Sequence, residues 1–162
     1  MKPLKVVLLD VDGTLVDSND AHAQAWFEVF QRNGYPGTFE WIRELIGKGG
    51  DKLIPEVTGV TKDSDEGKRL AKERSALFAR EYLPQLRPFP QAEALLRRLY
   101  DSGLQLVVAS SANEDELGPL LNVCGALPFV HDQTSANDAS HSKPDPSITA
   151  SPAKQAAPRA KR

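Results

Sequence analysis

Two aspartates, Asp10 and Asp12, stand one residue apart directly after the apolar run Val6–Leu9. The run predicts a buried strand, and the period-2 alternation of a strand directs both carboxylates to the same side. Because like charges directed at one point repel, the pair needs a cation or a shared proton between them. Ligands bind beyond the carboxyl ends of strands in open α/β sheets, so the pair indicates a functional site there. The alternative is an ordinary turn, in which Asp and Gly are common.

The residues that follow the aspartates favour the functional interpretation. Gly13 permits a tight turn or a close approach to a ligand, and Thr14 adds a hydroxyl. The longer string over residues 8–18, Leu-Leu-Asp-Val-Asp-Gly-Thr-Leu-Val-Asp-Ser, resembles the first motif of the haloacid dehalogenase superfamily. Most members of that superfamily are phosphohydrolases.

Two further motifs occur in the order that this resemblance implies. The apolar segment 104–111 ends in Ser110 and Ser111 and is similar to the second motif, whose hydroxyl holds the phosphoryl group. Lys143, in the sequence Lys-Pro-Asp-Pro, resembles the third motif, whose lysine neutralises the charge of phosphate and nucleophile. The resemblance therefore covers about residues 5–146.

The resemblance implies a phosphoryl-transfer mechanism with a role for each residue. Asp10 would attack phosphorus and form an aspartyl-phosphate, and Asp12 would act first as general acid and then as general base. Mg²⁺ would be bound by Asp10, the backbone carbonyl of Asp12 and an acid of the fourth motif. Ser110 and Lys143 would hold the transferring oxygens, helped by backbone N–H groups near Asp12 and Ser111. We prefer Ser110 to Ser111 because Ser110 directly ends the apolar strand, which makes Ser111 a turn hydroxyl.

Features between the first and second motifs indicate a branch of the superfamily. The segment 17–26 is similar to the branch of phosphoglycolate phosphatase and β-phosphoglucomutase, and in it His22 either couples cap closure to acid–base chemistry or lies on the surface of an amphipathic helix. The loop 47–50, Gly-Lys-Gly-Gly, resembles a substrate-specificity loop in which Lys48 meets a substrate anion or is simply solvated. Mutases of the branch carry an arginine in this loop, so its glycines favour a phosphatase. Dehalogenases lack an acid at the position of Asp12. The expected substrate contacts are Gly13, Thr14, Ser111, His22 and Lys48.

Hydrophobic periodicity predicts an α/β fold whose core is interrupted by an all-helical stretch. This stretch resembles the helical cap that family members carry, and the resemblance implies a Rossmann-like parallel sheet for the core. We expect strands at 6–10, 104–110 and 129–130, and helices at 21–33, 39–46, 52–57, 68–82, 91–102 and 114–125. The core would comprise residues 1–16 and 84–146, the cap residues 17–83, and a disordered basic tail residues 147–162.

The fourth motif, a strand that ends in acidic residues, has no counterpart after Lys143. We therefore expect a truncated or frame-shifted chain, with a natural basic tail as the alternative. The strand of the fourth motif would pair beside the first strand, so the expected sheet is incomplete and Val6–Leu9 has an open edge that favours self-association. The expected function is a Mg²⁺-dependent phosphatase of a small phosphorylated metabolite, impaired in this chain by the truncation. The alternatives are a sugar-phosphate mutase and a non-catalytic remnant.

Composition bounds the remaining possibilities. The 162 residues carry a formal net charge of -2, which gives no strong field for nucleic acid or a membrane surface. No segment reaches the roughly 18 apolar residues of a membrane span, and Asp10 interrupts the N-terminal apolar run too early for a signal peptide. The one cysteine, Cys124, excludes an internal disulfide and favours a cytoplasmic location, where it would act as a small buried hydrophobe.

Overall fold

The computed structural model describes residues 5–48 and 50–135, and these residues build a three-stranded parallel sheet. The strands are β1 (Val6–Leu9), β2 (Gln105–Ala109) and β3 (Val130–Thr134), in the spatial order β1-β2-β3. Val6 lies opposite Gln105 and Leu9 opposite Val108, so β1 and β2 end at the same edge of the sheet. The predicted parallel α/β fold is confirmed.

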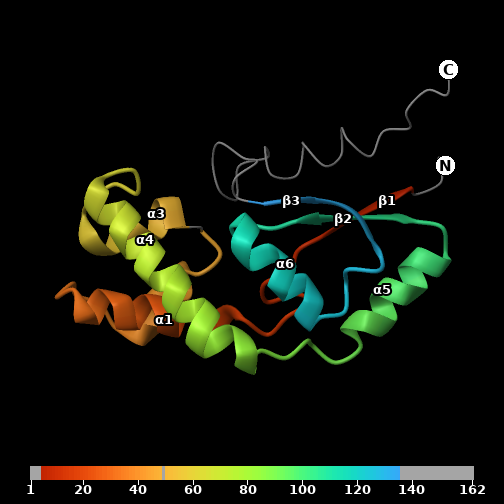
Figure 1. Ribbon diagram of the computed structural model, residues 1–162, viewed down its shortest axis with the longest axis horizontal. Helices are drawn as coiled ribbons and strands as arrows, with labels where there is room; N and C mark the ends of the chain where they lie inside the picture. Colours follow the sequence, from red (N-terminus) through yellow and green to blue (C-terminus); the bar gives the residue numbers. More distant parts are fainter. Residues whose placement is uncertain (1–4, 49, 136–162) are drawn as a thin grey trace, which may run out of the picture.

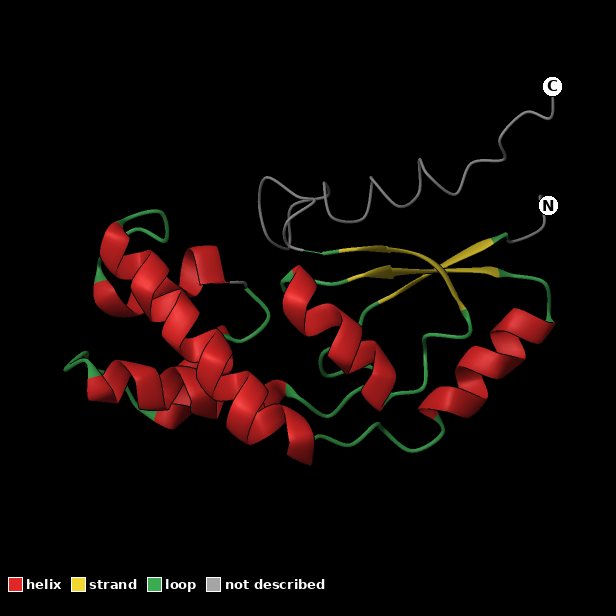
Figure 2. Cartoon of the chain, in the orientation of Figure 1, coloured by secondary structure: helices red, strands yellow, loops and turns green. Residues whose placement is uncertain are grey.

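Helices fill the chain between β1 and β2. They are α1 (Asn19–Arg32), α2 (Phe39–Leu45), α3 (Gly50–Thr58) and α4 (Asp65–Leu77), followed by a π-helical turn (Phe78–Tyr82), a 3₁₀ turn (Leu83–Gln85) and α5 (Ala92–Asp101). α6 (Glu114–Val123) connects β2 to β3. Figure 1 shows α1, α3 and α4 grouped at one end of the molecule, while α5 and α6 lie beside the sheet. The drawing by secondary structure shows that group as helices and loops, as expected for a helical cap (Figure 2). The proposed domain boundaries stay a prediction.

Two elements differ from their predicted bounds for identifiable reasons. α4 begins at Asp65 rather than Lys68, because Ser64 caps the helix and its Oγ accepts a hydrogen bond from the N–H of Gly67 at 3.0 Å. β3 continues through polar residues to Thr134, although only 129–130 looked like a strand. At an irregularity of its register with β2, the N–H of Leu106 donates to Nδ1 of His131 at 3.1 Å, so a side chain takes the place of a backbone acceptor.

Buried apolar side chains form a cluster that extends from the helical group to the sheet. Phe30 and Phe78 are fully buried in the helical group. Leu96 of α5 and Leu106 of β2 are fully buried in the same cluster. Cys124 is 1% exposed, which confirms its reading as a small buried hydrophobe; a cytoplasmic location stays a prediction. Within residues 5–48 and 50–135, no helix is both long and apolar enough to cross a membrane.

β1 forms one edge of the sheet, as far as the described residues show. Leu8, on this strand, is 40% exposed. An apolar edge strand with unpaired backbone groups is a template for pairing with another chain. Self-association through β1 is therefore the expected behaviour, and it stays a prediction.

Replacing Leu8 with Lys tests that prediction. A charge on an edge strand opposes edge-to-edge pairing, so we expect self-association to weaken by about tenfold, or about 1.4 kcal/mol. Sedimentation velocity over a concentration series measures the effect. Leu95→Lys is the matched control, because Leu95 is also an exposed leucine but lies on α5. Equal association of the two variants and the unmodified chain would rule out β1 as the contact.

Candidate active site

The turn after β1 is fixed by its backbone. The carbonyl of Val11 accepts hydrogen bonds from the N–H groups of Leu15 at 2.8 Å and Val16 at 3.0 Å. Gly13 has a φ of +72°, and a Cβ at this position would lie 2.1 Å from Nδ2 of Asn19. Both the left-handed conformation and the close approach require glycine, so the predicted tight turn is present.

Asp10 and Asp12 open onto one cavity of about 220 Å³. The cavity lies where β1 and β2 end, and residues of α1 and α4 contribute to its lining. Acidic, basic and amide side chains line it together with an apolar wall. The lining comprises Asp10, Asp12, Asn19, His22, Trp26, Leu45, Ile46, Gly47, Leu53, Lys62, Ala71, Arg74, Ser75, Ser111, Asn113 and Glu116. The mixture of charged groups and hydrophobic wall is typical of a small-molecule site.

Asp12 is held by two hydrogen bonds from the start of α1. The hydroxyl of Ser18 donates to Oδ1 of Asp12 at 2.6 Å, and Nε2 of His22 lies 2.8 Å from the same oxygen. Ser18 stands at the N-cap of α1 but makes no side-chain cap bond, since its hydroxyl is used by the aspartate. His22 is only 6% exposed, so the alternative of a surface histidine is wrong.

Arg74 fixes the tautomer of His22. A terminal nitrogen of Arg74 contacts Nδ1 of His22, and a guanidinium can only donate hydrogen bonds. Nδ1 is therefore the unprotonated nitrogen, and Nε2–H donates to Asp12. Nη1 of the same arginine donates to Oε1 of Glu116 at 2.6 Å. A continuous chain of polar contacts thus runs from α6 through α4 and α1 to the turn after β1.

Aromatic rings pack against the side chains of this series of polar contacts. The His22 and Phe78 rings stack at a centroid distance of 4.2 Å and an interplanar angle of 9°. The guanidinium carbon of Arg74 lies 4.9 Å from the ring centre of Phe78 and 5.5 Å from that of Trp26. Exclusion of water by these rings strengthens each charged contact. Phe78 begins the π-helical turn, a feature that is frequent at functional sites.

The pKa of Asp12 lies below its ordinary value of 3.8. Burial alone would raise it, but the hydrogen bonds from His22 and Ser18 and the positive charge of Arg74 together favour the carboxylate. Asp12 is therefore ionised at neutral pH and able to accept a proton.

This depressed pKa predicts a pH-dependent contribution to stability. The contribution is fully present above the unfolded pKa of about 3.9 and disappears as the pH falls through the lower folded value. Compared with Asp12→Asn, the unmodified chain should therefore lose part of its advantage in the free energy of unfolding below about pH 4. Urea unfolding of both chains between neutral and acid pH measures it. A stability difference that stays constant or grows on acidification would show that Asp12 is not stabilised as a carboxylate.

The two serines after β2 are placed differently from our expectation. Ser110 is fully buried, and its Oγ accepts a hydrogen bond from the N–H of Ala112 at 3.0 Å. Ser111 is the serine that lines the cavity. In this geometry Ser110 shapes the turn, and Ser111 is the hydroxyl that a bound molecule would meet. The predicted phosphoryl contact of Ser110 stays a prediction.

Of the remaining predicted residues, Thr14 and Lys48 do not belong to the lining of the cavity. Thr14 is exposed, and its hydroxyl donates to Oδ2 of Asp10 at 3.2 Å. Lys48 is exposed and pairs with Glu56 at 3.3 Å, whereas its neighbour Gly47 lines the cavity. Lys143 lies outside the described residues. Substrate contacts of Gly13, Thr14 and Lys48 therefore stay predictions.

Sequence reasoning missed three charged residues of the cavity, Arg74, Glu116 and Lys62. A usable signal was present for two of them. Arg74 interrupts the apolar stripe formed by Leu70 and Leu77, and Glu116 is spaced one turn before a buried leucine of α6. A charged residue on an apolar helix face indicates a buried partner.

Asp10 and Asp12 supply oxygen ligands of the kind that Mg²⁺ prefers. Within residues 5–48 and 50–135, no group of three His, Cys, Asp or Glu side chains could hold a metal ion. Mg²⁺ usually keeps several waters and is bound through one or two carboxylates and a substrate phosphate. Asp10 and Asp12 both line the cavity, which therefore contains two carboxylates of the kind that such an ion uses, and the predicted Mg²⁺ site stays a prediction.

This chain is similar in sequence to known phosphatases. Validoxylamine A 7'-phosphate phosphatase of Streptomyces hygroscopicus subsp. limoneus is 30% identical over 143 residues, which are 88% of this chain and 66% of that protein. Phosphoglycolate phosphatase of Nitrosospira multiformis is 28% identical over 149 residues, with coverage of 89% and 66%. This chain thus spans just under two thirds of the length of these relatives.

The fold and the family are shown by two further comparisons. The crystal structure of a hydrolase from Pseudomonas syringae superimposes with a TM-score of 0.84 at 26% identity and covers 94% of this chain and 70% of that one. The family model of haloacid dehalogenase-like hydrolases matches residues 4–155. The chain therefore belongs to the haloacid dehalogenase-like hydrolase family.

Proposed function

We propose that this chain hydrolyses a small phosphorylated metabolite in a Mg²⁺-dependent reaction that forms an aspartyl-phosphate on Asp10. The observation that carries the proposal is the Asp12 carboxylate, held by Ser18 and His22 at the same cavity as Asp10. A nucleophile beside a positioned proton acceptor is what a two-step phosphoryl transfer needs. Two relatives named as phosphatases support the same activity.

Asp10 and Asp12 divide the reaction between them. A carboxylate oxygen of Asp10 attacks phosphorus, while a proton that the phosphomonoester brings in as its monoanion passes through Asp12 to the leaving oxygen. Asp12, now ionised, then takes a proton from the water that hydrolyses the aspartyl-phosphate. Both hydrogen bonds from α1 end on Oδ1 of Asp12, so Oδ2 is the atom through which the proton moves.

Charge compensation comes from several groups. Mg²⁺, held by Asp10 and the backbone carbonyl of Asp12, would offset the negative charge of the phosphoryl group. Ser111, which lines the same cavity, would donate a hydrogen bond to a phosphoryl oxygen. Lys143 is proposed for the same purpose through the family resemblance.

Release of inorganic phosphate from a panel of phosphomonoesters tests the proposal. We expect release with Mg²⁺ and its loss when EDTA removes the ion. Absence of release from every member of the panel in the presence of Mg²⁺ would contradict the proposed function. Transfer of the phosphoryl group to a second sugar, without free phosphate, would identify a mutase instead.

A further inference from the structure

A buried ion pair forms part of the cavity wall. Arg74 of α4 and Glu116 of α6 meet at 2.6 Å, and their side chains are only 10% and 6% exposed. Both residues line the cavity. Because the carboxylate lies directly on the guanidinium, the charge of this arginine is already compensated before any ligand enters.

The guanidinium also lacks a free pair of terminal nitrogens. One terminal nitrogen donates to Glu116 and the other contacts His22. A carboxylate or phosphate that binds arginine tightly needs two parallel N–H groups from it. Because both terminal nitrogens are already engaged, a second anionic group of a substrate competes with Glu116 and His22 for Arg74.

Arg74 has further donors, because each of its terminal nitrogens carries a second N–H. Its Nε is buried and has no hydrogen-bond partner among the described residues. A buried N–H without an acceptor is costly, and both side chains of the ion pair line the cavity. A hydroxyl satisfies both members of the ion pair, since its oxygen accepts from an N–H and its proton is donated to a carboxylate.

The neighbouring groups favour hydroxyls as well. Trp26, Asn19 and Ser75 line the same cavity and supply an aromatic face, an amide and a hydroxyl. Such groups bind neutral polar molecules without adding charge. Lys62 is the other cation of the lining, and it is exposed, so water screens its charge.

We propose that Glu116 is a specificity-determining residue, which selects phosphomonoesters with a neutral, hydroxyl-bearing leaving group over those with a second anionic group. This inference rests on the proposed phosphatase function and names its substrate class. The neutral leaving group contacts the Arg74–Glu116 pair, whereas a carboxylate there meets the negative charge of Glu116 beside an arginine whose charge is already compensated.

Two small ligands of matched size test the inference, 2-hydroxyethyl phosphate and 2-phosphoglycolate. They differ only in a CH₂OH group against a carboxylate. Their dissociation constants are measured by NMR titration with Mg²⁺ on the full chain carrying Asp10→Asn, which stops turnover. We expect 2-hydroxyethyl phosphate to bind at least about tenfold more tightly, and Glu116→Gln to bring the ratio to within about threefold. Gln keeps the shape of Glu and an oxygen that accepts from Arg74.

Two control variants keep the result interpretable. Glu114→Gln removes the same charge from an exposed position of α6 and should leave the ratio unchanged. Glu116→Asp keeps the carboxylate and should keep the preference, which provides a second readout if the Gln variant does not fold. Thermal melting of each variant checks folding.

Different outcomes separate the two proposals. Binding of both ligands with a preference for 2-phosphoglycolate, or a ratio that Glu116→Gln leaves unchanged, overturns the role of Glu116. A preference for the carboxylate that Lys62→Met abolishes would assign an anion site to Lys62 instead. Failure of both ligands and of inorganic phosphate to bind would overturn the proposed function itself.

Discussion

Asp10→Asn is expected to lower Mg²⁺-dependent phosphate release by on the order of 10⁴-fold or more. The amide has nearly the shape of the carboxylate but is a poor nucleophile, so the covalent step is lost while the cavity is kept. Turnover under substrate saturation measures the loss, and circular dichroism checks that the fold is unchanged.

Asp17→Asn is the matched control for this variant. Asp17 is an exposed acid that follows the same turn, and it does not belong to the residues found around the cavity of Asp10. We expect its turnover to stay within about twofold of the unmodified chain. Substantial turnover in Asp10→Asn would show that another group attacks phosphorus.

Arg74→Met is expected to cause the largest loss of stability among single substitutions at the cavity, about 3–5 kcal/mol in the free energy of unfolding. The methionine leaves Glu116 as a buried carboxylate without its cation and removes the donor to Nδ1 of His22. The measurement is urea unfolding at neutral pH, with the slope of the transition compared between variants.

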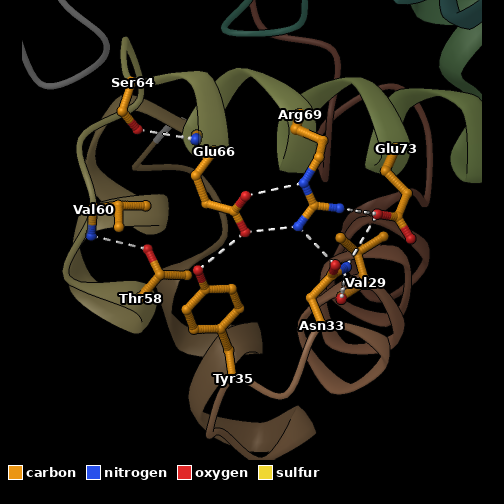
Figure 3. Close-up of polar contacts among 10 residues, drawn as sticks. Val29, Asn33, Tyr35, Thr58, Val60, Ser64, Glu66, Arg69 and Glu73 are labelled. Carbon is orange, nitrogen blue, oxygen red and sulfur yellow. Dashed lines mark hydrogen bonds and ion pairs between the residues drawn. The ribbon is translucent and has the colours of Figure 1, made fainter.

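Arg69→Met is the matched control on the same helix. Figure 3 shows Arg69 directed at Glu66, Glu73 and Asn33, with ion-pair distances of 2.6 Å to Glu66 and 3.4 Å to Glu73. Its side chain is 50% exposed, and exposed pairs contribute little to stability. We expect Arg69→Met to cost no more than about 1 kcal/mol. Equal losses in the two variants would mean that burial of the Arg74 pair has no special importance.

The sequence predicted those parts of the site that depend on local chemistry. Asp10, Asp12 and Gly13 follow one another on a strand and a turn, and the geometry of such a unit depends on a few adjacent residues. The helical segment between β1 and β2 can also be predicted from the sequence, because apolar residues recur there at helical spacing.

The contacts between distant segments cannot be predicted from the sequence in this way. Arg74 and Glu116 lie 42 positions apart, and nothing in either helix names the other as its partner. His22 illustrates the same limit, since the helical pattern could not distinguish an exposed histidine from one buried against Asp12 and Arg74. Tertiary packing decides such cases.

Hydrophobic periodicity cannot decide which of two neighbouring serines reaches the cavity. Ser110 and Ser111 follow the same strand, and only the path of the turn decides which hydroxyl reaches the cavity. β3 was underestimated for a related reason, because its polar residues carry no strand pattern and its pairing with β2 includes the His131 side chain.

Reductive trapping of the covalent intermediate tests the central claim most directly. Borohydride reduces an aspartyl-phosphate to homoserine, and peptide mass spectrometry locates the modified position after the chain has reacted with a phosphomonoester and Mg²⁺. The proposed mechanism predicts homoserine at position 10 in the unmodified chain and none in Asp10→Asn. Phosphate release with no homoserine at position 10, or with the modification at another residue, would contradict it.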